Sequence, residues 1–196
     1  MAAAARRSPD RGRRRRKPAG GTSSVAVSKT LTIVRHAKSS WDDPVLADFD
    51  RPLNPRGLRD APRMGARLAK TGITPDRLVS SPANRALATA KIIAAALGLE
   101  TRIIVPDERL YLASADMIMR IVQEQPDEVS SLMLFGHNPG MTDLVHRLGD
   151  CPLANLPTGA CVTFRVEVDR WAATGPDNTR LEVVDYPKKR IAADAG

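Results

Sequence analysis

Short apolar runs and longer stretches of helical periodicity alternate along this chain. The runs have the aliphatic, β-branched composition of buried strands, and proline, glycine and polar clusters separate them. Strands are predicted at residues 31–34, 78–79, 101–105, 131–135, 160–168 and 181–186. The last two flank a turn at Gly175-Pro176 and are close enough in sequence to pair in antiparallel fashion.

The first predicted helix begins at Asn54-Pro55, an N-cap residue followed by proline at the first helical position. It is expected to reach about Lys70, with Gly72 just past its end. Pro62 lies inside this helix and should kink it, because proline lacks a backbone donor and its ring clashes with the preceding turn.

Three further helices are predicted between the later strands. Ser81-Pro82 has the same N-cap and first-position pattern, and it begins an alanine-rich helix over residues 83–97. Another helix is expected over residues 115–125. Asn138-Pro139 caps the last one, which runs to Leu148.

The order of these elements predicts the fold class. Strands that alternate with helices indicate an α/β protein with a mostly parallel sheet and helices on both faces, and the last two strands form an antiparallel edge. The sequence shows no internal repeat and no second core. We expect one domain over residues 30–190, a basic and disordered N-terminal tail over 1–29, and a short C-terminal tail over 191–196.

The net charge of +8 comes from the N-terminal tail. Residues 1–29 contain nine lysines or arginines and a single acid, Asp10, whereas the chain from Thr30 onward has equal numbers of basic and acidic residues. The domain surface therefore gives no reason to expect nucleic-acid binding. The tail itself is open to three interpretations: a disordered extension, an organellar transit peptide, or a polyanion-binding segment centred on residues 13–17.

We expect a cytoplasmic protein, with organellar targeting by the arginine-rich start left open. No apolar stretch approaches the ~20 residues that a membrane span needs, so no membrane partner is expected. Cys151 and Cys161 match neither a CxxC redox pair nor a zinc half-site, which suits a reducing compartment.

Basic side chains follow three of the predicted strands, at the point where each strand ends. Arg35-His36 follows the first strand, Arg85 lies in the first turn of the helix after Ser80-Ser81, and His137-Asn138 follows the strand at 131–135. Parallel strands bring their carboxyl ends to one edge, where open α/β sheets bind ligands. Arginines bind phosphate oxygens, an imidazole can attack phosphorus, and helix N-termini favour anions. The sequence therefore predicts a site for a phosphoryl group.

Each residue also has a structural interpretation. Taken singly, Arg85 suits a solvated helix position, Arg35 could pair with a carboxylate such as Asp50, and His137 could be a hydrogen-bonded core histidine. His146 is assigned no role. Carboxylates that could bind magnesium are absent from the three strand ends, so we expect neither a metal nor another cofactor.

Four motifs in order resemble the histidine phosphatase superfamily, and in particular its SixA-type phosphohistidine phosphatases. They are RHAKSSW (35–41), DRPLNPRG (50–57), SSPANRALATA (80–90) and GHNPG (136–140), with PTGA (157–160) also similar. The resemblance implies a phosphoglycerate mutase-like fold, a three-layer α/β/α sandwich with an antiparallel edge strand. It also implies an open site without the lid insertions of larger relatives.

The resemblance implies specific roles for the site residues. His36 would carry the phosphoryl group as a phosphohistidine, and the phosphate would be bound by Arg35, Arg85, His137 and Asn138. The general acid is not settled: the position matching the mutase glutamate is Leu112, and the matching aspartate of another branch is Asn138. Glu108 is the possible general acid, with Asp42 as a second candidate; either could equally be a surface charge.

The expected function is therefore a metal-independent phosphatase that uses a nucleophilic histidine, with phosphohistidine on a protein as its substrate. One alternative is a phosphomonoesterase of the same superfamily that acts on small phosphorylated molecules. Another is a non-catalytic phosphate-binding module, which would need Arg35, Arg85 and His137 without a nucleophilic histidine. A third is a domain that its basic tail tethers to a polyanion.

Overall fold

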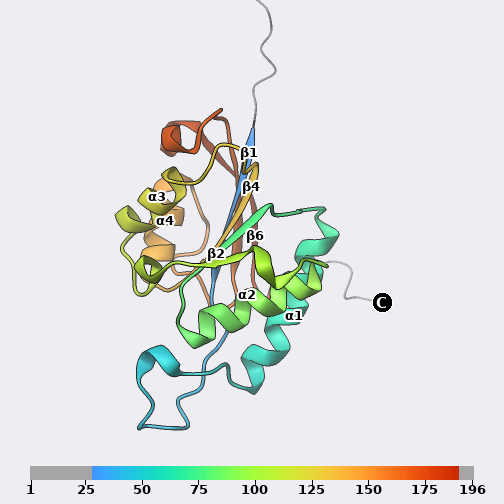
Figure 1. Cartoon of the computed structure of the whole chain (residues 1–196), viewed down its shortest axis with the longest axis vertical. Helices are drawn as coiled ribbons and strands as arrows, with labels where there is room; N and C mark the ends of the chain where they lie inside the picture. Colours follow the sequence, from blue (N-terminus) through green and yellow to red (C-terminus); the bar gives the residue numbers. More distant parts are fainter. Residues whose placement is uncertain (1–27, 190–196) are drawn as a thin grey trace, which may run out of the picture.

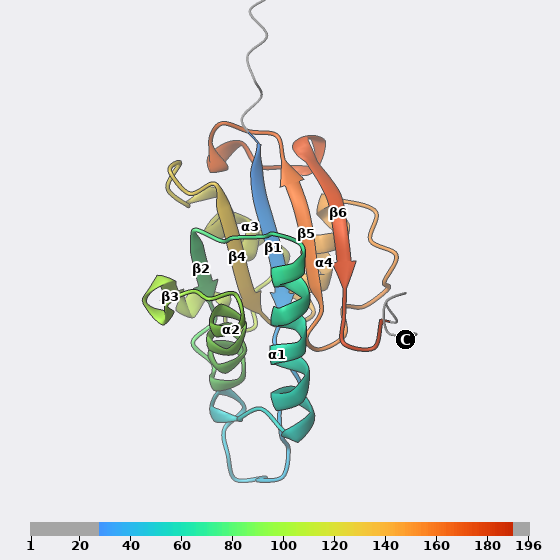
Figure 2. The same ribbon diagram turned by 90° about the vertical axis from the view of Figure 1, so that its right-hand side faces the viewer.

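The computed structural model describes residues 28–189 (Figure 1). Within them six strands form one sheet in the order β3-β2-β4-β1-β5-β6 (Figure 2). The strands are β1 (Lys29–Arg35), β2 (Arg77–Ser80), β3 (Ile104–Pro106), β4 (Ser131–Gly136), β5 (Cys161–Val166) and β6 (Thr179–Asp185). The helices are α1 (Pro55–Lys70), α2 (Asn84–Ala96), α3 (Ala115–Gln123) and α4 (Gly140–Leu148). Short 3-10 helices include η1 (Asp48–Asp50), η2 (Thr101–Ile103) and η3 (Glu108–Leu110).

The helices cover both faces of the sheet, so the expected three-layer α/β/α sandwich is confirmed. Figure 2 shows α1 and α2 in front of the sheet and α3 and α4 behind it. Side chains that alternate along the central strands supply both layers of the core. Leu31 and Ile33 pack with α3 and α4, whereas Val34 and Met133 pack with α1 and α2. Full burial of such an aliphatic side chain contributes roughly 1.5–3 kcal/mol.

Strand direction places the loops that follow β1, β2 and β4 at one edge of the sheet. β1 pairs in parallel with β4, β4 with β2, and β2 with β3. The expected antiparallel pair is present, because β5 is antiparallel to β1 and to β6. The antiparallel strand β5 lies one position inside the edge, and β6 forms the edge itself. The carboxyl ends of the parallel strands lie at the lower end of the molecule in Figure 2, beside the loop that follows β1.

The sequence predicted the first helix closely. The Asn54 side chain accepts a hydrogen bond from the Gly57 backbone N–H at 2.9 Å, which is the expected N-cap. The helix ends at Lys70, and Gly72 follows with a positive φ of 75°. The helix continues as one element through Pro62.

Two predicted helix starts are wrong by one or two residues. The Ser81 hydroxyl contacts the His137 ring at 2.8 Å instead of capping a helix at Pro82, and α2 begins at Asn84. The Asn138 side chain donates to the Leu156 carbonyl at 3.1 Å, and α4 begins at Gly140 without a side-chain cap. In both places the predicted capping side chain is used for a contact between distant segments.

Other predicted elements differ from the structure in where they begin or end. Lys29, which we placed in the tail, is the first residue of β1, and its buried ammonium donates to the carbonyl oxygens of Asp127 and Val129. The strand expected at 101–105 is a 3-10 turn followed by the short β3. The predictions for residues 1–27 and 191–196 lie outside the described residues. Within residues 28–189, every helix is too short or too polar to cross a membrane.

Candidate active site

Four predicted site residues meet at the carboxyl edge of the sheet. Arg35 ends β1, His36 follows it, Arg85 lies in the first turn of α2, and His137 follows β4. The Nε of Arg85 lies 3.4 Å from Nε2 of His36, and the two imidazole centroids are 5.1 Å apart. The parallel pairing of β1 with β4 and of β4 with β2 therefore brings segments far apart in sequence to one point.

A pocket of about 160 Å³ opens at this point. Most of its lining is cationic or hydroxyl-bearing: Arg35, His36, Lys38, Ser39, Trp41, Arg51, Arg85 and Thr158. No carboxylate lines it among the described residues. Such a lining favours an anion over a neutral or cationic ligand.

The contacts of His36 fix which nitrogen is available to react. Nδ1 lies 2.7 Å from the Ala37 carbonyl oxygen, which can only accept, so Nδ1 carries the hydrogen and Nε2 keeps its lone pair. Burial, together with the positive charges of Arg85, Arg35 and Arg51, lowers the pKa of His36 to about 4. His36 is therefore neutral at pH 7, and its unprotonated Nε2 accepts a hydrogen bond from Arg85 Nε at 3.4 Å. An unprotonated ring nitrogen has the lone pair that a nucleophile requires.

His137 is oriented by Ser81. The Ser81 hydroxyl oxygen accepts from the Ala83 N–H at 3.3 Å and lies 2.8 Å from Nε2 of His137; we assign the Ser81 hydroxyl as the donor of this second bond. That assignment leaves the hydrogen of His137 on Nδ1. Burial, and then the charges of His36 and Arg85, lower the pKa of His137 to about 3. His137 is thus a neutral hydrogen-bond donor at pH 7.

Two buried nitrogen atoms of these side chains have no hydrogen-bond partner among residues 28–189. They are Nδ1 of His137 and Nε of Arg35, while Nη1 of Arg35 donates to the Leu156 carbonyl. Buried donors are normally paired, so two unpaired donors on neighbouring site residues indicate a missing acceptor. An oxyanion in the pocket would supply acceptor oxygens.

Sequence reasoning missed Asp48. Its carboxylate accepts hydrogen bonds from Arg85 Nη2 at 2.8 Å, from the Tyr111 hydroxyl at 2.9 Å and from Arg51 Nη1 at 2.7 Å. The Asp48 carbonyl also accepts from Arg85 Nη1. Partial burial alone would raise the pKa of Asp48, but the hydrogen bonds from Tyr111, Arg85 and Arg51 outweigh it and lower the pKa to about 2. Asp48 is therefore an ionised acceptor that holds Arg85.

Arg51 and Gly57 fix the loop around the pocket. Arg51 donates to the Ser40 carbonyl at 2.8 Å, and its guanidinium stacks 3.2 Å from the ring centre of Trp41. Gly57 allows α1 to approach the chain just after His36, because a Cβ there would lie 2.1 Å from the Lys38 carbonyl oxygen. Both contacts order the segment on which His36 lies.

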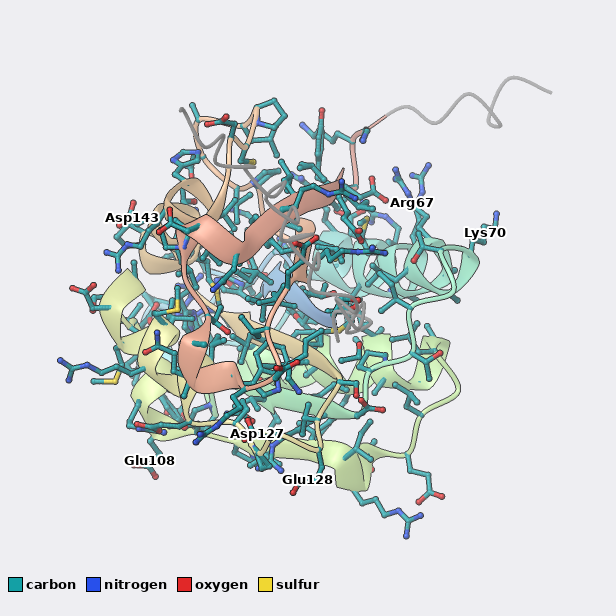
Figure 3. All side chains as sticks on the ribbon, turned by 90° about the horizontal axis from the view of Figure 1, so that it is seen from above. Arg67, Lys70, Glu108, Asp127, Glu128 and Asp143 are labelled. Carbon is teal, nitrogen blue, oxygen red and sulfur yellow. The ribbon has the colours of Figure 1, made fainter. Side chains whose placement is uncertain are left out.

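The structure does not bring Glu108 or Asn138 into the pocket. Glu108 is exposed, and Figure 3 shows its side chain at the outer margin of the molecule, on the side away from Lys70. Asn138 uses its side-chain amide donor for the Leu156 carbonyl and the Asn155 side chain. Among residues 28–189, its buried side-chain oxygen has no hydrogen-bond partner. Phosphate binding by Asn138 stays a prediction.

The observed contacts and burial also bear on the structural interpretations of Arg35, Arg85 and His137. Arg35 donates to the Leu156 carbonyl and makes no ion pair with Asp50. Arg85 is buried, and so is His137. Asp42 is exposed and lines a different hollow, beside Pro52 and Leu53. Across residues 28–189, no three His, Cys, Asp or Glu side chains are arranged to bind a metal ion.

A signal for Asp48 was present in the sequence. The loop over residues 42–50 contains four aspartates in a chain whose basic pocket residues need a counter-charge. That pattern does not say which aspartate turns inward, because the loop has no periodicity. Tyr111 gave no comparable signal, and Ser81 appeared as a helix cap.

The sequence model of a protein family, the histidine phosphatase superfamily (branch 1), matches residues 31–111 of this chain. An uncharacterized protein of Mycobacterium tuberculosis is 32% identical over 168 residues, which are 79% of this chain and all of that protein. An uncharacterized chloroplastic protein of Arabidopsis thaliana is 29% identical over 86% of this chain and 82% of its own length. The chain belongs to the histidine phosphatase superfamily.

Solved structures agree with the fold. A SixA protein from Agrobacterium tumefaciens, provisionally assigned as a phosphohistidine phosphatase, is 28% identical, covers 81% of this chain and 98% of its own, and has a TM-score of 0.68. The protein histidine phosphatase SixA in complex with tungstate is 21% identical over 81% of this chain and 97% of its own, with a TM-score of 0.67. This member of the superfamily is thus similar in fold to SixA-type proteins over 81% of its chain.

Proposed function

We propose that this chain is a metal-independent phosphatase that removes the phosphoryl group from phosphohistidine on proteins, with His36 as its nucleophile. The observation that carries the proposal is the neutral His36 imidazole, whose unprotonated Nε2 lies 3.4 Å from Nε of the phosphate-binding candidate Arg85. The two unpaired buried donors, Arg35 Nε and His137 Nδ1, support an oxyanion at the same place.

In this mechanism, Nε2 of His36 attacks phosphorus in line with the leaving nitrogen. The P–N bond of the substrate breaks, and a new P–N bond forms to His36. Arg35, Arg85 and His137 donate to the equatorial oxygens, where negative charge persists in the transition state. Water then hydrolyses the phosphorylated His36, which releases inorganic phosphate and restores the imidazole.

The leaving group favours a phosphohistidine over an alkyl phosphate ester. An alkoxide must be protonated on the leaving oxygen itself. A phosphorylated imidazole can instead take a proton from water on its other ring nitrogen, and the P–N electron pair then goes to a neutral imidazole as it leaves. Asp48 is ionised at neutral pH and hydrogen-bonded to Arg85, so it is not suited to donate a proton. Glu108 lies outside the pocket. The described residues thus favour a substrate that does not need a strong protein acid.

A protein substrate is supported by the surface around the pocket. Apolar side chains of the loop after β1 are exposed beside it: Trp41 is 70% and Val45 90% exposed, with Leu46 and Phe49 more than one third exposed. Trp41 lines the pocket itself. Exposed apolar groups that cluster around a site are typical of a surface that contacts another protein.

A substrate comparison tests this proposal. We expect a phosphohistidine peptide to be hydrolysed with a kcat/KM at least about a hundredfold above that of a phosphoserine peptide of the same sequence or of a sugar phosphate, since one missing proton donor costs on the order of 10²–10⁴. His36→Ala should abolish turnover. Equal turnover of the ester and the phosphohistidine would favour a small-molecule phosphomonoesterase, and phosphate binding without any turnover would favour a non-catalytic module.

A further inference from the structure

A strongly basic surface lies beside the active site, between α1 and the segment after β6. Its hollow, of about 380 Å³, is lined by Arg56, Arg59, Asp60, Arg63, Pro187, Lys188 and Lys189. We refer to these residues as the basic hollow. It contains five cationic side chains and one carboxylate, and that carboxylate, Asp60, pairs with Arg56 at 3.2 Å.

The positive charge is concentrated at this surface and is not a property of the whole domain. Residues 28–189 contain 21 lysines and arginines against 20 aspartates and glutamates, so the described part of the chain is almost neutral. Helix α1 nevertheless has five cations and a single acid in 16 residues, at spacings that repeat every three or four positions. Figure 3 shows Lys70, the last of these cations, pointing away from the body. The field at this face is therefore positive while that of the whole domain is weak.

Contacts of Arg67 hold together the two segments that form the basic hollow. Arg67 of α1 is buried and forms an ion pair with Asp185 at the end of β6. The same guanidinium donates to the Tyr186 carbonyl at 3.4 Å and to the Lys189 carbonyl at 3.3 Å. In Figure 2 the end of β6 lies beside α1. Arg67 thus holds the chain that presents Lys188 and Lys189 against the helix.

Shared lining residues relate the basic hollow to the catalytic pocket. A second hollow, of about 160 Å³, is lined by Arg56, Pro157, Thr158, Tyr186, Pro187 and Lys188. It shares Arg56, Pro187 and Lys188 with the basic hollow. It shares Thr158 with the pocket of Arg35, His36 and Arg85. A chain segment lying along these hollows would touch both sites.

We infer that the basic hollow binds an acidic segment of the phosphoprotein substrate, next to the phosphorylated side chain that enters the pocket. This inference rests on the proposed function and adds the sequence context of the substrate. Carboxylates would pair with Arg59 and Lys188, for which the described structure shows no carboxylate partner. Such rim charges steer association and set specificity more than they add affinity.

The test compares two double variants of the full-length protein. Arg59→Gln with Lys188→Gln removes two charges of the basic hollow. Lys91→Gln with Arg120→Gln removes two exposed charges on α2 and α3 that line none of these hollows. The substrates are a phosphohistidine peptide with aspartates and glutamates around the histidine, the same peptide with asparagines and glutamines, and phosphoimidazole, which has no flanking chain.

We expect the wild-type protein and the control variant to prefer the acidic peptide on the order of fivefold, and the basic-hollow variant to lose that preference. Hydrolysis of phosphoimidazole should be equal in all three proteins. The preference should disappear in about 1 M salt, where charges are screened within about 3 Å. Thermal unfolding midpoints would show that both variants fold.

The possible failures are distinguishable. If wild-type protein hydrolyses phosphoimidazole and both peptides with no preference, or if the two double variants behave alike, the docking inference is wrong and the proposed function stands. If it hydrolyses none of the three, the proposed function is wrong. Binding of the unphosphorylated acidic peptide, measured by fluorescence anisotropy, tests the hollow without catalysis. Tighter binding of a single-stranded RNA of equal charge at the same residues would overturn the acidic segment as its ligand.

Discussion

The carboxylate of Asp48 lies 2.8 Å from Nη2 of Arg85 and holds this guanidinium by its outer edge. The Asp48 carbonyl binds Nη1 of the same guanidinium. With both terminal nitrogens engaged, Nε is the donor that faces Nε2 of His36 at 3.4 Å. A residue from an irregular loop thus sets the direction in which the phosphate-binding arginine presents its hydrogen atoms.

Replacing Asp48 with alanine should slow phosphorylation of His36 about tenfold, because Arg85 would lose the carboxylate that binds its Nη2 and keep only the backbone carbonyl on Nη1. Asp48→Asn keeps an amide oxygen and an amide nitrogen at this position, so the phosphorylation rate should fall less than in Asp48→Ala. Rapid-quench measurement of phosphoenzyme formation gives the rate. Arg85→Ala, with an expected loss of rate of about 10²–10³, sets the largest loss that mispositioning of Arg85 can cause. Unchanged rates in Asp48→Ala would show that Arg85 is positioned without it.

Replacing Ser81 with alanine should affect both stability and rate. Nε2 of His137 would lose its partner at 2.8 Å in a buried position, which costs about 1–3 kcal/mol. For a domain of this size the unfolding midpoint should fall by about 2–4 °C for each kcal/mol. Calorimetry gives the midpoint. Ser81→Thr keeps the hydroxyl, and recovery of the rate in that variant would separate orientation of His137 from packing.

The two active-site histidines make the stability of the protein depend on pH. In the native protein their pKa values lie near 4 for His36 and near 3 for His137, below the 6.5 of an exposed imidazole. As the pH falls from about 6.5 to 4, the unfolded chain binds protons that the native protein does not, so the free energy of unfolding falls.

At pH 5 this loss should be roughly 2 kcal/mol for each histidine relative to pH 7. Urea unfolding at the two pH values gives the difference, and His36→Gln should show a smaller one than wild type. NMR titration of the imidazole resonances measures the pKa values directly. A pKa near 6.5 for His36 would contradict its assignment as a buried neutral nucleophile.

Glu108→Gln should leave kcat/KM on a phosphohistidine peptide within about twofold of wild type, as is usual for an exposed charge outside the site. Parallel assays on the peptide and on an alkyl phosphate check this. Loss of activity on both substrates would show that Glu108 reaches the leaving group after all.

Much of the fold and of the pocket follows from local sequence rules. Buried strands are short and apolar, and the residues after β1 and β4 are therefore fixed at the carboxyl edge once the strands are parallel. These rules alone predict that Arg35, His36, Arg85 and His137 lie together. The N-cap at Asn54 is equally local, since the side chain and the backbone N–H that it binds are three residues apart.

What the sequence did not reveal depends on contacts between distant segments. Asp48 reaches Arg85 across 37 positions, and the Ser81 hydroxyl reaches His137 across 56. Ser81 and Asn138 have the residue types of helix caps, and only the tertiary structure shows that their side chains are used elsewhere. Lys29 continues the charge pattern of the preceding residues, yet two carbonyl groups and the ring of Trp171 surround its ammonium in the core.

The central claim of the proposed mechanism is that His36 carries a covalent phosphoryl group on Nε2. We would react the protein with a radiolabelled phosphohistidine peptide, quench within milliseconds in alkali and map the label by proteolysis. The account predicts one labelled peptide containing His36, with a linkage stable in base and lost in acid, and no label in His36→Ala. Turnover with the label on any other residue, or with no covalent label at all, would contradict it.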